Sequence, residues 1–179
     1  METNERLLLM TEIASRHPGI GKTAMMKITY LMQTLRDVPF GYHFEIYTYG
    51  PYCQTVMSDI EYAESIHYIQ INSIGYGDGI YGYQISTTDE GQSILSSADG
   101  RGDYTAQMND ILNFFGDMSA KDLELYSTIV FVASSCSANN WDTSMKNICN
   151  TVHSIKPHFP IDTIHTAFHN LEDHTFLPV

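Results

Sequence analysis

The histidines toward the end of the chain are the residues best suited to metal chemistry, because imidazole is a common metal ligand. His165 and His169 lie four residues apart on a predicted helix, a spacing that lets both rings face one metal ion. The pair lacks the intervening glutamate of the zinc-protease motif, and no cysteine or carboxylate supplies a further ligand at a diagnostic spacing. The pattern therefore favours helix-surface histidines, and we predict no metal.

A glycine-containing segment, Gly19-Ile20-Gly21-Lys22-Thr23, ends like a phosphate-binding P-loop. The complete motif requires another glycine five residues before Gly21, where this chain has Arg16. The segment also lies between two predicted helices, whereas a P-loop follows a strand. We therefore interpret it as a turn followed by a helix start, and we predict no cofactor.

The three cysteines, Cys53, Cys136 and Cys149, are the candidate nucleophiles. They are widely spaced and form no Cys-x-x-Cys pair, which is typical of reduced thiols in a cytosolic protein. Cys53 falls in the first turn of a predicted helix, where the helix dipole favours a thiolate. Since no histidine can be placed beside it, we predict no catalytic residue and no enzymatic activity.

Charge and composition limit the remaining classes of function. The chain has 179 residues with a formal net charge of −12, and both halves are acidic. Proteins that bind nucleic acid draw much of their affinity from Lys and Arg, so this balance disfavours that class. The N-terminal segment lacks the features of a signal peptide, and the longest apolar run, residues 129–133, is too short for a membrane helix. We expect a cytoplasmic protein that does not contact membranes.

Residues 1–98 have the pattern of a winged helix-turn-helix. Apolar residues recur at three- and four-residue spacing in the first two segments, and the period then falls to two. We expect the resulting first strand to pair with a later hairpin. The predicted elements are helices 5–16 and 22–36, strand 42–49, helix 51–65, strands 67–74 and 80–86, and a short helix beginning near residue 88.

Residues 104–179 have only helical periodicity, after a predicted linker at 99–103. Because four short amphipathic helices cannot bury their apolar faces alone, we expect them to pack together and on the first half. The predicted fold is α+β, mostly helical, and one compact structural unit. Each helix is marked by one apolar stripe: Met108 to Phe115, Leu123 to Ala133, Trp141 to Ile155, and Ile161 to Leu171.

The aromatic segment 42–52 is the densest feature of the chain. Its tyrosines either lie beneath the C-terminal helices or form an exposed surface, where tyrosine is enriched in protein interfaces. The candidate partner-binding residues are Tyr47, Tyr49, Gly50, Pro51 and Tyr52.

The helix predicted at 51–65 would be the recognition helix of a DNA-binding winged helix. It carries Asp59, Glu61 and Glu64 but no Lys or Arg, so the phosphate backbone would repel it. Standard DNA readout is therefore disfavoured.

Several runs resemble the uncharacterised bacterial YwgA-like family, in which a lysine-anchored helix leads to a strand ending in Tyr-Gly-Pro-Tyr. The resemblance spans most of the chain and is carried by KITYL from Lys27, FEIYTYGPY from Phe44, Asp59-Ile60, KDLELYST from Lys121 and KPHF from Lys156. The chain is more distantly similar to the Panacea, or antitoxin SocA-like, domain, which has a related helix followed by a Gly-Pro turn. Cys53 stands where that resemblance would place a serine.

The resemblance implies a winged-helix core with added helices and a role in neutralising a toxin or adapting another protein. We expect a non-enzymatic, antitoxin-like regulator that binds another protein, with a basic partner suited to its acidic charge. The alternatives are a transcriptional regulator that binds DNA as a dimer, and a metal-dependent enzyme that uses the C-terminal histidines.

Overall fold

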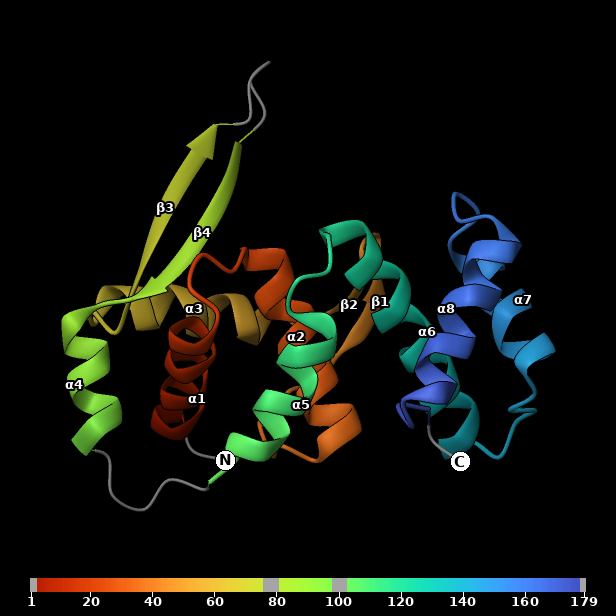
Figure 1. The fold of residues 1–179 in the computed structure, drawn as a ribbon, viewed down its shortest axis with the longest axis horizontal. Helices are drawn as coiled ribbons and strands as arrows, with labels where there is room; N and C mark the ends of the chain where they lie inside the picture. Colours follow the sequence, from red (N-terminus) through yellow and green to blue (C-terminus); the bar gives the residue numbers. More distant parts are fainter. Residues whose placement is uncertain (1–2, 76–80, 98–102, 178–179) are drawn as a thin grey trace.

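The protein is a mostly helical α+β structure, as expected from the sequence. The computed structural model describes residues 3–75, 81–97 and 103–177. Within these ranges it has eight helices and two separate two-stranded antiparallel sheets. The molecule is elongated, with one hairpin and α4 at one end and α7 and α8 at the other (Figure 1).

The helices of the first half follow the predicted periodicity closely. Helix α1 spans Thr3–Arg16 and α2 spans Lys22–Arg36. Helix α3 spans Gln54–Ser65 and buries Val56, Ile60 and Ala63, as predicted. Its predicted start at residue 51 was wrong, because Pro51 lies in a strand and the next two residues remain non-helical.

The prediction that strand 42–49 would pair with the later hairpin was wrong. Only β1, Glu45–Tyr47, is a strand in this region, and it pairs with β2, Gly50–Tyr52. Gly50 has a φ of +88°, a conformation that glycine adopts without strain, and it follows the two-residue turn that folds the chain back. The predicted alternation of buried and exposed side chains nevertheless holds from Tyr42 to Tyr47.

The later hairpin consists of β3, Ile69–Gly75, and β4, Tyr81–Thr87. It is joined to the loop between α1 and α2 at a single bridge, where the Ile85 N–H donates to the Ile20 carbonyl at 2.8 Å. Beyond this bridge the hairpin projects away from the helices (Figure 1). The predicted loop at 75–79 lies outside the described residues, apart from Gly75.

Helix α4, Asp89–Ser97, packs against α1 and completes the described part of the first half. It begins within one residue of the predicted start near 88, and the Thr88 hydroxyl accepts the Gly91 N–H at 3.0 Å. Most of the predicted linker that follows lies outside the described residues.

All four helices predicted for the second half are present. Helix α5 packs on α2, whereas α6, α7 and α8 pack on one another and α6 also covers α2 and β2. Among the described residues, none of the helices has both the length and the apolar character needed to cross a bilayer. The four helices are α5 Thr105–Phe115, α6 Ala120–Ala138, α7 Met145–Ile155 and α8 Ile161–Asp173.

The placement of Trp141 in the stripe of the third of these helices was wrong. Asp142 accepts the Ser144 N–H at 2.8 Å, and the Ser144 hydroxyl in turn caps α7, which starts at Met145. Trp141 therefore precedes the helix and is 62% exposed.

A single cluster of buried apolar side chains runs through both halves, from α1 to the segment after α8. One polar network crosses its edge: Asp59 Oδ2 accepts from Arg6 Nε and from the Tyr42 hydroxyl, both at 2.8 Å. Asp59 and Tyr42 are buried, so each depends on this network in place of water. The network ties α3 to α1 and to the aromatic segment.

Replacing the shared acceptor of this network should cost more stability than replacing a single donor. We expect Asp59→Ala to lower the free energy of unfolding by about 2–3 kcal/mol, because it leaves the buried Tyr42 hydroxyl with only the weak acceptor Met10 Sδ, 3.8 Å away. Tyr42→Phe should cost about 1 kcal/mol. The control Glu61→Ala, at an exposed position of the same helix, should change it by less than about 0.5 kcal/mol. Urea denaturation measures all three, and equal losses for Asp59→Ala and Glu61→Ala would contradict the expectation.

Candidate functional site

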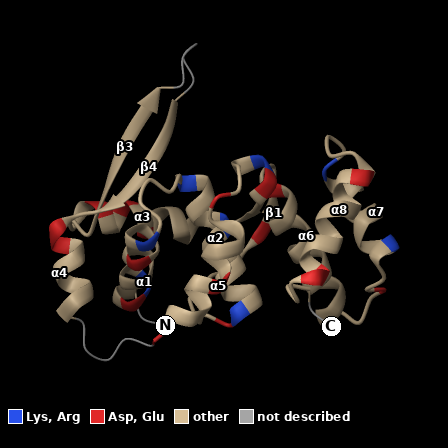
Figure 2. Cartoon of the chain, viewed as in Figure 1, with Lys and Arg blue, Asp and Glu red and all other residues tan. Residues whose placement is uncertain are grey.

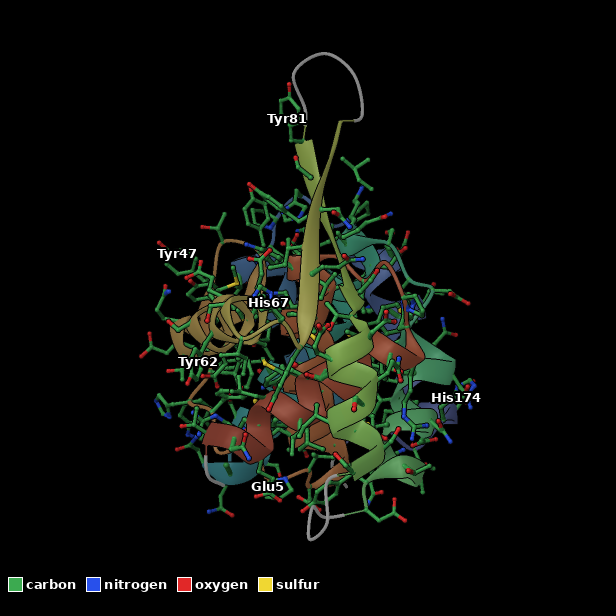
Figure 3. All side chains as sticks on the ribbon, turned by 90° about the vertical axis from the view of Figure 1, so that its left-hand side faces the viewer. Glu5, Tyr47, Tyr62, His67, Tyr81 and His174 are labelled. Carbon is green, nitrogen blue, oxygen red and sulfur yellow. The ribbon has the colours of Figure 1, made fainter. Side chains whose placement is uncertain are left out.

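The β1–β2 hairpin carries the residues that the sequence singled out for partner binding. The register pairs Tyr47 with Gly50, so Thr48 and Tyr49 form the turn. Tyr47 and Tyr49 are 67% and 68% exposed, and the rings of Tyr47 and Tyr52 lie 5.7 Å apart. We call Tyr47, Tyr49 and Tyr52 the tyrosine surface. Figure 3 shows Tyr47 projecting outward from the side of the molecule.

Gly50 and Pro51, the other two predicted residues, are buried. A Cβ atom added at Gly50 would lie 3.2 Å from Thr128 Oγ1 and 3.3 Å from Ser127 Oγ of α6. Glycine at this position thus allows both the turn and the close approach of the hairpin to α6. These two residues support the tyrosine surface from below.

A pocket of about 320 Å³ opens beside the tyrosine surface. Its walls come from the hairpin, from the first two turns of α2 and from α3, so elements separated by loops converge on it. We call it the tyrosine pocket. Its lining residues are Lys22, Thr23, Met26, Lys27, Tyr47, Tyr49, Tyr52 and Met57.

Two buried lysines hold the hairpin by its backbone. Lys27 of α2 and Lys156, the residue after α7, are each only 3% exposed. Lys27 Nζ donates to the Pro51 carbonyl at 2.5 Å. Lys156 Nζ donates to the Tyr47 carbonyl at 3.0 Å and also to the Thr48 carbonyl. The turn that presents the tyrosines is thereby fixed from two sides.

Glu124 of α6 is the counterion of this arrangement and is itself buried. Its Oε1 lies 3.0 Å from Lys156 Nζ, as an ion pair without the alignment of a hydrogen bond. The exposed His158 approaches the same oxygen at 3.5 Å. We call Lys27, Lys156 and Glu124 the lysine clamp.

The lysine clamp changes the proton affinity of Lys27. Burial lowers the pKa of its ammonium group to about 8, since a low-dielectric environment disfavours the charged form. The negative charge of Glu124 opposes this shift, and the positive charge of Lys156 adds to it. Keeping Lys27 protonated in this buried position therefore costs free energy relative to a lysine in water.

The phosphate-loop-like segment contributes to the same pocket. Lys22 and Thr23 are the first residues of α2 and line the tyrosine pocket. Lys22 Nζ also lies 4.7 Å from the centre of the Tyr83 ring on β4. The interpretation of a turn followed by a helix start matches the structure, in which α2 begins at Lys22.

The histidines and cysteines are not brought together. His165 and His169 lie on α8, where His169 Nδ1 is 3.3 Å from Glu172 Oε2. Within the described ranges, no three side chains among His, Cys, Asp and Glu are grouped so that they could hold a metal ion. All three cysteines are buried and free of disulfides, and burial raises the pKa of Cys149 to about 11.

Sequence reasoning placed the tyrosines but missed the roles of Lys27, Glu124 and Lys156. A signal was present for the first of these, because Lys27 interrupts the apolar run of Met25, Met26 and Ile28 on α2. A charged residue within such a run is rarely buried unless it has a polar partner. Nothing in the sequence pattern identified a carbonyl of the hairpin as that partner.

Comparison with known proteins gives no match of this chain to a family model or to a curated protein. The resemblance to the YwgA-like and Panacea families therefore stays a prediction.

The lowered pKa of Lys27 should make stability rise with pH in a defined window. Between about pH 8 and 10.5 the unfolded chain binds this proton and the folded chain releases it, so the free energy of unfolding increases with pH. The increase is at most about 1.4 kcal/mol per pH unit. Burial also raises the pKa of the Cys149 thiol to about 11, so this group acts in the opposite direction above about pH 9. Near pH 10 and above, Tyr30 and Tyr42 act in the same opposing direction, because burial raises the pKa of both phenols.

Urea denaturation between pH 8 and 9.5 therefore tests Lys27. We expect Lys27→Leu to remove most of the increase, whereas Lys146→Leu, at an exposed position of α7, should keep it. The same pH dependence in Lys27→Leu as in the wild type across this window would contradict the assignment, since Cys149 acts equally in both proteins.

Glycine at position 50 should be required more strongly than at position 41. Both residues have positive φ, at +88° and +73°, but no atom lies within 4 Å of a Cβ added at Gly41. Gly41→Ala should therefore cost about 1 kcal/mol of backbone strain alone. Gly50→Ala should cost about 2–4 kcal/mol, since it also pushes the hairpin away from α6. Thermal denaturation of both variants checks the order, and equal losses would refute the close packing.

Proposed function

We propose that this protein is a non-enzymatic regulator, with an antitoxin-like or adaptor role, that binds another protein through the tyrosine surface. The observation that carries the proposal is the exposure of Tyr47 and Tyr49 on a turn whose backbone is held by buried lysines. Tyrosine offers a large contact area and loses little conformational entropy on binding. A turn whose backbone is already fixed loses little further conformational entropy on binding, and this favours affinity.

The charge of the molecule supports a partner of opposite sign. Acidic side chains outnumber basic ones 21 to 9, and they are distributed over many elements (Figure 2). Such a field accelerates the approach of a basic protein through long-range attraction. A basic partner is therefore part of the proposal.

We further propose that α1, α2, α3 and the β3–β4 hairpin form a winged-helix unit. The order of these elements supports it, and the pairing of Ile20 with Ile85 takes the place of the short first strand of that fold. The β1–β2 hairpin would then be an addition between the second and third helices. In such a unit α3 would be the recognition helix of a DNA-binding protein, and its lack of Lys and Arg disfavours DNA binding through it.

Retention of a partner should depend on the tyrosine surface. We expect a stoichiometric protein to remain bound when the tagged wild type is purified gently from its native host. The double variant Tyr47→Ser/Tyr49→Ser should retain it at least tenfold less, because central interface tyrosines contribute about 2 kcal/mol each. Tyr62→Ser is the matched control, since Tyr62 is also exposed but lies on α3, away from the pocket lining. Mass spectrometry quantifies the retained protein.

Two results would contradict the proposal. In the first, the double variant retains the partner as well as Tyr62→Ser does. In the second, the protein carries nucleic acid that is lost at higher salt, with no protein partner, which would favour the DNA-binding alternative.

A further inference from the structure

The lysine clamp holds one more positive than negative charge. Lys27 and Lys156 are both buried, and Glu124 is the one carboxylate among the described residues that interacts electrostatically with Lys27. The Glu124 carboxylate forms its ion pair with Lys156, whose Nζ lies 3.0 Å from Oε1. A buried cation without its own counterion is costly, so a negative charge supplied beside Lys27 would be favourable.

Lys27 lines the tyrosine pocket, so an external group can reach its surroundings. Its ammonium group has three protons, one of which is donated to the Pro51 carbonyl at 2.5 Å. An anion in the pocket would accept another of these protons in a charge-assisted hydrogen bond. An anion in the pocket would therefore lie beside the excess charge of the clamp.

The start of α2 adds to the positive character of the pocket. Gly21 is the N-cap residue and offers no side-chain acceptor, and the first turn of the helix contains no acidic residue. The N-terminal N–H groups of a helix attract anions. Lys22 and Thr23, the first two residues of this helix, line the pocket.

The aromatic and apolar side chains of the pocket lining determine what kind of molecule can carry the anionic group. Tyr47, Tyr49 and Tyr52 contribute rings, and Met26 and Met57 contribute flexible apolar side chains that adapt to an aromatic or aliphatic group. A ligand that fits therefore carries a single anionic group on an apolar body. A bare inorganic ion would leave the apolar walls uncovered.

We propose that the tyrosine pocket binds a carboxylate of the partner protein, together with the apolar group that carries it. This inference rests on the proposed function and names the chemistry that the same surface recognises. A carboxylate carries one negative charge and so matches the excess of one buried charge, whereas a phosphate monoester carries about −1.5 to −2. The carboxylate comes from an acidic side chain or from the end of the partner chain.

The test uses three small probes that share a phenyl group: hydrocinnamate, its neutral amide hydrocinnamamide, and phenyl phosphate. Binding to the whole protein is followed by NMR of isotope-labelled methionine methyl groups, because Met26 and Met57 line the pocket. Their signals are assigned with Met26→Leu and Met57→Leu. Hydrocinnamate should shift both signals and bind at least tenfold more tightly than hydrocinnamamide.

Two lysine variants show where the discrimination arises. Lys27→Leu should reduce the preference for hydrocinnamate over hydrocinnamamide to less than twofold, whereas Lys146→Leu should leave it unchanged. Unperturbed methionine signals outside the pocket show that Lys27→Leu is folded. If it does not fold, the comparison of the two probes on the wild type still decides the matter.

Equal binding of acid and amide, or no binding of hydrocinnamate, would overturn the inference. Tighter binding of phenyl phosphate than of hydrocinnamate would overturn the choice of carboxylate. If partner retention requires the tyrosine surface while the probes show no preference for charge, the proposed function stands and this inference fails. Once a partner is known, replacing its acidic side chains and amidating its C-terminus separates the two sources of the carboxylate.

Discussion

Burial of two ammonium groups against a single carboxylate is the constraint on which this structure depends. Lys27, Lys156 and Glu124 come from α2, from the segment after α7 and from α6. Each lysine is removed from water, so each must find oxygen atoms at well-defined positions. The carbonyls of the β1–β2 hairpin supply them. A hydrophobic contact would tolerate small displacements of these elements, but this polar arrangement does not, and the relative positions of the two halves follow from it.

The helices could be predicted because apolar periodicity is a local property of the chain. Helix α2 has the predicted bounds, and α6 contains the whole of the apolar stripe predicted from Leu123 to Ala133. The pairing of the strand at 42–49 could not be predicted in the same way. Its alternation identified the buried face correctly, but pairing depends on the turn, and the left-handed conformation of Gly50 brings β2 back onto β1. The same local competition affected Trp141, where a side-chain cap at Ser144 outweighed an apolar stripe.

Part of the candidate site could be identified from the sequence, because some of its residues are neighbours along the chain. Its tyrosines are close in sequence, so the composition of one segment singled them out, but it left open whether they are exposed or lie beneath the C-terminal helices. The charged residues beneath them are distant: the hydrogen bond from Lys156 to the Thr48 carbonyl spans 108 residues. Glu124 occupies a helix position that looks solvent-exposed by type, and only packing of α6 against β2 makes it buried. Long-range contacts of this kind leave no periodic trace in a single sequence.

The large sequence separation between Lys156 and the hairpin also determines when the tyrosine surface can form during synthesis. A chain emerging from the ribosome folds from its N-terminal side, and the hairpin at 45–52 is synthesised long before residue 156. Until then the turn has only the Lys27 contact, without the second lysine or its carboxylate. Closing a loop of this length is also slow compared with forming the local helices. The tyrosine turn is therefore completed only after residue 156 has been synthesised, and a truncated chain that lacks the segment after α7 would display the tyrosines without their fixed geometry.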